Sequence, residues 1–143
     1  MARHALLFLS MACYVACLWP DSFCVASSCS DWPGVGILLT GWIMIGASAA
    51  NATWLANPLL FCAWIALLLG LRLWSLVIGL PALAVAASFM LADTVVTNEG
   101  GVANPITGLR IGYWLWLGSM ALSCVASLTT AKNSAPAQQA PPG

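Results

Sequence analysis

Five long stretches without a charged side chain alternate with short polar segments along the chain. They are Ala5–Trp19, Gly34–Ala50, Trp54–Gly70, Leu73–Ala92 and Ile111–Leu128. A helix that crosses the hydrocarbon core of a bilayer needs roughly 20 apolar residues, with about 17 near the lower limit. The fourth and fifth stretches meet that length, and the other three are marginal. The pattern therefore predicts a polytopic membrane protein.

The composition supports this prediction and narrows the fold class. Charged residues make up 6% of the 143 residues, against about 25% in soluble domains. In lipid every backbone N–H and C=O must be satisfied internally, which leaves helices or closed barrels. Barrel strands alternate apolar and polar residues, whereas segment 63–69 is apolar on all faces. We expect an all-α transmembrane bundle in a single membrane domain, residues 1–132, followed by a disordered tail, residues 133–143.

The few charges help to count the crossings. If all five stretches cross, the basic residues are divided between the two sides of the membrane. If Gly34–Ala50 folds back or lies along one face, the bases Arg3, Arg72 and Lys132 become cytoplasmic. The acids then all lie outside: Asp21, Asp31, Asp93 and Glu99. The positive-inside rule favours this arrangement, so we predict four crossings plus one re-entrant or interfacial segment, with five crossings as the alternative.

Local signals add detail to the helices. Glycines at 34, 36, 41 and 46 weaken the second stretch as a continuous helix. Asn57-Pro58 is typical of a helix start, with Asn57 as the cap. Gly70–Leu73 predicts a tight helical hairpin. Trp42 and Trp64 fall deep inside their stretches and are predicted to pack. Residues 97–108 are expected to form a polar loop.

The N-terminal stretch has three interpretations. An uncleaved first helix is the prediction. A signal peptide cleaved after Ala26 is an alternative, although Cys24 fits the small-residue rule for cleavage only loosely. Lipidation at Cys13 or Cys17 is a further alternative, without a good lipobox before either residue.

Cys24 and Cys29 lie in a polar loop that is expected to face an oxidising compartment. Such a pair most simply forms a structural disulfide. The alternative is a redox-active pair that passes electrons to a membrane quinone, but the second outer loop, Asp93–Arg110, has no cysteine to partner it. Cys13 and Cys17 have the i, i+4 spacing of metal ligands without histidines or carboxylates nearby, so packing is the expected role.

No residue set typical of catalysis is present. His4 is the only histidine, and no nucleotide-binding loop occurs. A net charge of zero provides no basic field for nucleic acid. No charged residue is expected at the bilayer midplane, which argues against proton-coupled transport. We therefore predict no catalytic residue, no cofactor-binding residue and no metal ligand.

Two helices carry small residues at four-residue spacing, a pattern that allows close helix approach in lipid. These residues are Ala82 and Ala86 in one helix, and Ser119, Ser123 and Ser127 in the next. Packing within the bundle is the expected role, and homodimerisation is the alternative.

Three strings, 54–59 (WLANPL), 98–101 (NEGG) and 112–117 (GYWLWL), together with Gly41-Trp42, resemble a group of small bacterial multi-pass membrane proteins of unknown activity. The resemblance covers roughly Cys29–Ser123 and implies a bacterial cytoplasmic membrane. It marks eight possible functional positions: Trp54, Asn57, Pro58, Glu99, Gly100, Gly101, Tyr113 and Trp114. In the four-crossing arrangement these residues would meet at the outer face.

These observations lead to one expected function and two alternatives. We expect a non-enzymatic protein that resides in the lipid bilayer and acts by helix–helix association, with itself or with a membrane complex. A thiol-redox enzyme that uses Cys24 and Cys29 is the first alternative, and a minimal transporter or channel is the second.

Overall fold

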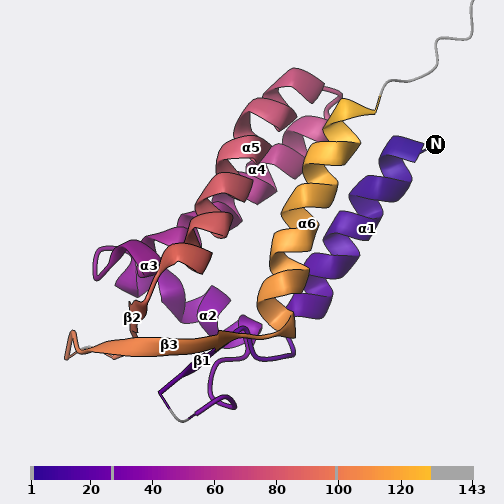
Figure 1. Cartoon of the computed structure of the whole chain (residues 1–143). Helices are drawn as coiled ribbons and strands as arrows, with labels where there is room; N and C mark the ends of the chain where they lie inside the picture. The colour runs from indigo at the N-terminus through magenta and orange to yellow at the C-terminus, as the bar shows by residue number, and fades with distance from the viewer. Residues whose placement is uncertain (1, 27, 99, 130–143) are drawn as a thin grey trace, which may run out of the picture.

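A computed structural model of the chain describes residues 2–26, 28–98 and 100–129. Its main body is a bundle of four helices: α1 (Ala2–Cys17), α4 (Ala56–Leu68), α5 (Arg72–Ser88) and α6 (Ile111–Leu128). Helix α6 packs against α1 on one side and α5 on the other, and α5 also packs against α4. The start of α1 and the end of α6 lie at the same end of the bundle (Figure 1).

The helices have the length and surface of a membrane protein. Three are long and apolar enough to cross a bilayer: Ala49–Leu68, Arg72–Leu91 and Ile111–Leu128. Helix α1 is a shorter apolar helix of 16 residues. Large apolar side chains are exposed on the outside of the bundle, as contact with lipid requires: Phe8, Leu9, Ile65, Leu73, Val77, Leu80 and Val125. The predicted helical bundle is confirmed to this extent.

A three-stranded sheet lies across one end of the bundle (Figure 1), so the all-α prediction is wrong. Strands β1 (Phe23–Val25), β2 (Thr94–Val96) and β3 (Ala103–Leu109) pair antiparallel in the order β1-β3-β2. Strand β3 occupies the whole second half of the expected polar loop. Strands β1 and β2 have three residues each and are too short to show an alternating pattern. Strand β3 has seven residues, but it contains Asn104, Pro105 and Gly108, which are typical of loops.

The stretch from Gly34 to Ala50 is not one continuous helix. It contains α2 (Gly34–Thr40), the 3-10 helix η1 (Gly41–Met44) and the start of α3 (Ala49–Ala52). Helix α3 runs through η2 (Thr53–Leu55) directly into α4. The helix therefore begins well before the expected Asn57-Pro58 start, and its cap is Ser48, whose side chain accepts from the Asn51 N–H.

Helix α2 begins where α1 ends. The Val35 N–H donates to the Leu18 carbonyl at 2.8 Å, and the Gly34 N–H donates to the Pro20 carbonyl at 3.3 Å. Both helix termini would otherwise leave backbone groups without partners. A Cβ at Gly34 would overlap the Cys17 carbonyl, so this junction requires glycine.

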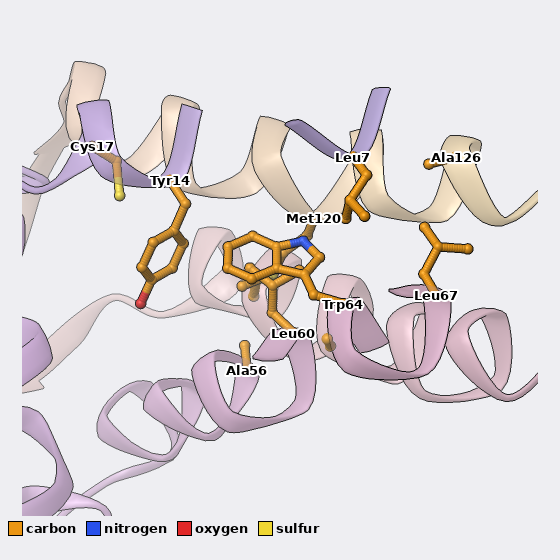
Figure 2. Close-up of a cluster of buried hydrophobic side chains, with 11 residues drawn as sticks. Leu7, Tyr14, Cys17, Ala56, Leu60, Trp64, Leu67, Met120 and Ala126 are labelled. Atoms are coloured by element: carbon orange, nitrogen blue, oxygen red, sulfur yellow. The ribbon is translucent and has the colours of Figure 1, made fainter. Parts of the chain in front are cut away.

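The core has two parts. The first fills the space between the bundle helices, and Figure 2 shows Tyr14 of α1 and Trp64 of α4 reaching into it. The second lies under the sheet and includes Phe23, Phe89 and Tyr113. Trp64 is buried as predicted, whereas Trp42 is exposed, because its segment lies at the end of the bundle rather than within it.

Interhelical hydrogen bonds join the first core. The Trp64 indole N–H donates to Ser10 Oγ at 2.9 Å, and that hydroxyl donates to the Ser119 carbonyl at 2.6 Å. The hydroxyls of Ser75 and Ser127 share a hydrogen bond of 2.8 Å between α5 and α6. The small residues of the two predicted packing faces are all buried inside the single chain: Ala82, Ala86, Ser119, Ser123 and Ser127.

The predicted hairpin between α4 and α5 ends α4 in a Schellman motif. The Leu71 N–H donates to the Ala66 carbonyl at 2.8 Å, and the Gly70 N–H donates to the Leu67 carbonyl at 3.1 Å. Gly70 has φ +81°, in the left-handed region, where a side chain is unfavourable.

Replacing Gly70 with alanine is expected to lower the free energy of unfolding by about 1 kcal/mol, because of this backbone conformation. Beyond Gly70 and its two chain neighbours no atom lies within 4 Å of the added Cβ, so overlap with other parts of the protein does not contribute. Reversible unfolding in mixed detergent micelles measures the change. The matched control is Gly118→Ala in α6, which also has open space around its Cβ but a helical backbone, and should be neutral or stabilising. Equal effects of the two substitutions would contradict the expectation.

Candidate functional site: a cavity between the bundle and the sheet

A cavity of about 450 Å³ lies where the bundle meets the sheet and helices α2 and α3. This volume is within the range of small-molecule sites, about 300–1,000 Å³. The bundle side of its lining includes Tyr14, Trp54, Asn57, Tyr113 and Trp116. The opposite side is formed largely by apolar residues of α2, η1 and the sheet, among them Ile37, Leu38, Met44, Val95 and Val96.

The buried amide of Asn57 joins three helices at the inner end of this cavity. Its Oδ1 accepts from the Tyr14 hydroxyl of α1 at 3.0 Å and from the Trp116 indole N–H of α6 at 2.8 Å. Asn57 itself belongs to α4 and is only 5% exposed. Buried polar groups without partners are costly, so this single amide fixes the relative positions of three helices.

The amide nitrogen of Asn57 replaces a backbone hydrogen bond that the next residue, Pro58, cannot make. Pro58 has no N–H to donate to the carbonyl of Trp54, four residues earlier. Asn57 Nδ2 donates to that carbonyl instead, at 3.0 Å. The predicted role of Asn57 as a helix cap is therefore wrong: the helix continues through this point, and the side chain replaces a missing backbone hydrogen bond within it.

Trp54 joins the bundle to the cavity wall, a name used here for α2 and η1, residues Gly34–Met44. Its indole N–H donates to the Leu38 carbonyl at 3.1 Å. A Cβ at Gly41 would overlap the same indole ring. Glycine at position 41 thus lets the wall lie flat against Trp54.

Aromatic rings form the part of the lining nearest the sheet. Phe23 and Trp32 are stacked, with ring centroids 5.7 Å apart. Phe89 contacts Phe23 at 5.4 Å and Tyr113 at 5.7 Å between centroids. The Tyr113 hydroxyl donates to the Ala86 carbonyl of α5 at 3.0 Å, which links α6 to α5.

Only some of the residues marked by the sequence resemblance line the cavity. Trp54, Asn57 and Tyr113 line the same cavity. Pro58 and Trp114 do not line it, and Trp114 is half exposed. Gly100 and Gly101 are exposed in the connection between β2 and β3, where Gly101 has φ +70°. Glu99 lies outside the described residues, as do residues 133–143 of the expected tail.

Several lining residues were not singled out from the sequence as candidates. Tyr14 and Trp116 are the clearest cases, because each donates to Asn57. A tyrosine hydroxyl within an otherwise apolar helix was an available signal, since such a group needs a partner in lipid. No sequence signal pointed to Ile37 or Leu38 as cavity residues, because their position depends on how the wall docks.

Cys24 and Cys29 form the predicted disulfide, with Cα atoms 4.2 Å apart. Cys24 belongs to β1, so the bond closes the turn that follows this strand. Neither cysteine lines the cavity. Cys13 and Cys17 are free thiols, and within residues 2–26, 28–98 and 100–129 no group of three or more His, Cys, Asp or Glu side chains could hold a metal ion.

Comparisons with known proteins give no relative. No family model matches the chain, and neither a curated protein nor a solved structure matches it. The resemblance of the three Trp-rich and Gly-rich strings therefore stays a prediction, and the cavity has to be interpreted from its own residues.

Replacing Asn57 with leucine is expected to lower the free energy of unfolding by at least about 1 kcal/mol, because the buried donors of Tyr14 and Trp116 lose their acceptor. Unfolding in mixed micelles measures this loss. In the double variant with Tyr14→Phe the second substitution should cost little more, since the hydroxyl it removes already has no partner. Fully additive costs for the two substitutions would show that the Tyr14–Asn57 hydrogen bond contributes nothing.

Proposed function

We propose that the chain crosses the membrane four times, with α1, α4, α5 and α6 as the crossing helices and the wall at the outer interface. Helix α2 has 7 residues, which at 1.5 Å per residue gives only about 10 Å of length. Arg72 Nη1 donates to the Thr129 carbonyl at the end of α6, near the start of α1, which carries Arg3. Asp21, Asp31 and Asp93 lie at the opposite end, with Arg110 the only base there in the described ranges.

This distribution of charge supports a cytoplasmic position for the end that holds Arg3 and Arg72. The sheet and its disulfide would then face an oxidising compartment. A bacterial cytoplasmic membrane, which the sequence resemblance implies, agrees with both features.

The function that we propose is the binding of a small, uncharged and mainly apolar ligand in the cavity, without chemical conversion. The observation that carries this proposal is the state of the lining polar groups on the bundle side. The donors of Tyr14, Trp54, Asn57, Tyr113 and Trp116 all make hydrogen bonds within the protein. On this side of the cavity a ligand would therefore meet mainly ring faces.

The alternatives have less support. A thiol-redox enzyme would need its cysteine pair close to the site where a quinone binds, and the disulfide lies outside the cavity lining. Association through the small-residue faces would need exposed residues, and all five are buried in the chain. Transport would need a route past the hydrogen-bonded Asn57, Tyr14 and Trp116 at the inner end of the cavity.

Fluorescence quenching by a small brominated molecule tests the binding proposal in detergent solution. A short, water-soluble brominated alcohol should quench tryptophan fluorescence saturably, because bromine quenches on contact and three tryptophans line the cavity: Trp32, Trp54 and Trp116. Gly36→Leu should weaken this binding at least tenfold by filling the cavity. Gly36 lines the cavity, and its Cβ would make only an ordinary contact with Pro33, at 3.8 Å.

The matched control is Gly118→Leu, which places the same side chain in open space away from the cavity. It should bind the probe like the wild type. A brominated carboxylate of equal length should bind at least tenfold more weakly, because the one charged residue in the described lining is Asp31. Equal quenching in the wild type and Gly36→Leu would refute the proposed function.

The position of the C-terminus tests the crossing count. A reporter enzyme fused after residue 143, active only in the cytoplasm, should be active if the four bundle helices cross. A second reporter, active only outside the cytoplasm, should be silent at the same position. The reverse pattern would support five crossings. It would put β1 and β3 on opposite sides of the membrane, where they could not pair as they do in this structure.

A further inference from the structure

The cavity wall has two different apolar faces. Ile37, Leu38 and Met44 line the cavity. Val35, Leu39 and Trp42 follow at helical spacing on the other face and are 44%, 67% and 58% exposed. The second face is apolar and not covered by the protein, so it is suited to contact with lipid at the membrane interface.

Ile43 belongs to both faces. It lines the cavity, and it is also 60% exposed. The cavity therefore reaches the outer surface at η1, beside the exposed stripe.

Other exposed apolar residues mark the same end of the bundle. Trp19 follows α1, Leu91 ends the 3-10 helix η3 (Phe89–Leu91) after α5, and Ile111 and Trp114 begin α6. Exposed tryptophans at the helix ends are typical of the boundary between lipid and water. No charged residue occurs between positions 32 and 71, so nothing in the wall opposes contact with lipid.

We infer that the ligand is the hydrocarbon chain of a bilayer lipid, which enters the cavity sideways from the outer leaflet past η1. This inference rests on the proposed function and names the ligand and its source. The hydrocarbon chain would contact apolar side chains on both sides of the cavity, while the polar part of the lipid stays at the interface. A hydrocarbon chain also needs no hydrogen bond from the already engaged donors of Asn57, Tyr14 and Trp116.

Trp54 is the residue best placed to report this event. It lines the cavity and connects the bundle to the wall through the Leu38 carbonyl. Trp42 provides the contrast, because it lies on the outer stripe and its indole N–H donates to the Leu39 carbonyl within the wall, at 2.9 Å. The two indoles sample the two faces of the same segment.

The test uses full-length protein in liposomes that contain a phosphatidylcholine with bromine atoms on one acyl chain. This lipid stays in the bilayer, so it reaches the cavity only from the side. The cavity-dependent quenching is defined as the quenching lost in Gly36→Leu but kept in Gly118→Leu. We expect it to be present in the wild type and reduced at least twofold in Trp54→Phe, whereas Trp42→Phe keeps it unchanged.

The outcomes separate this inference from the function on which it depends. If the short brominated alcohol shows cavity-dependent quenching and the brominated lipid shows none, the ligand comes from water and the lipid inference is overturned. If neither probe shows it, the proposed function fails as well. Trp54 quenching that persists unchanged in Gly36→Leu would place lipid outside the cavity and would also overturn the inference.

Discussion

The structure depends on the hydrogen bonds of one buried amide. In lipid a polar side chain cannot form hydrogen bonds with water, so its partners must come from the protein. Asn57 supplies an acceptor for α1 and α6 at once, and its nitrogen replaces the backbone hydrogen bond that Pro58 cannot make. The helix that contains Pro58 can therefore remain continuous from Ala49 to Leu68, and three of the four bundle helices are held in register at one level.

The level of Asn57 also marks the end of direct packing between the bundle helices. On one side of Asn57 the helices pack directly, with Trp64 and Ser10 in the next interhelical contact. On the other side the short helices and the sheet cover the helix ends and leave the cavity between them. Glycines make this covering possible: at Gly34, Gly41 and Gly112 a Cβ would lie too close to a backbone carbonyl or an indole ring. The short helices and the sheet can lie this close to the bundle only because these positions have no side chain.

On the bundle side of the cavity the donors of Tyr14, Trp54, Asn57, Tyr113 and Trp116 already have partners within the protein. A charged molecule that entered the cavity would lose its hydration and would gain few hydrogen bonds from this side. Together with a wall that is apolar on both faces, this supports our proposal of a ligand that resides in the membrane.

The sequence alone determined where the protein resides and how several local features form. The scarcity of charge requires a membrane, since no soluble surface can be built from these residues. Gly70 predicts a hairpin and Cys24 and Cys29 predict a disulfide, because each of these features depends on residues close together in the chain. Only the tertiary structure decided the sheet, the partners of Asn57 and the cavity. Each of these brings together segments from distant parts of the chain, and a helical or apolar pattern specifies which faces are buried but not which faces meet.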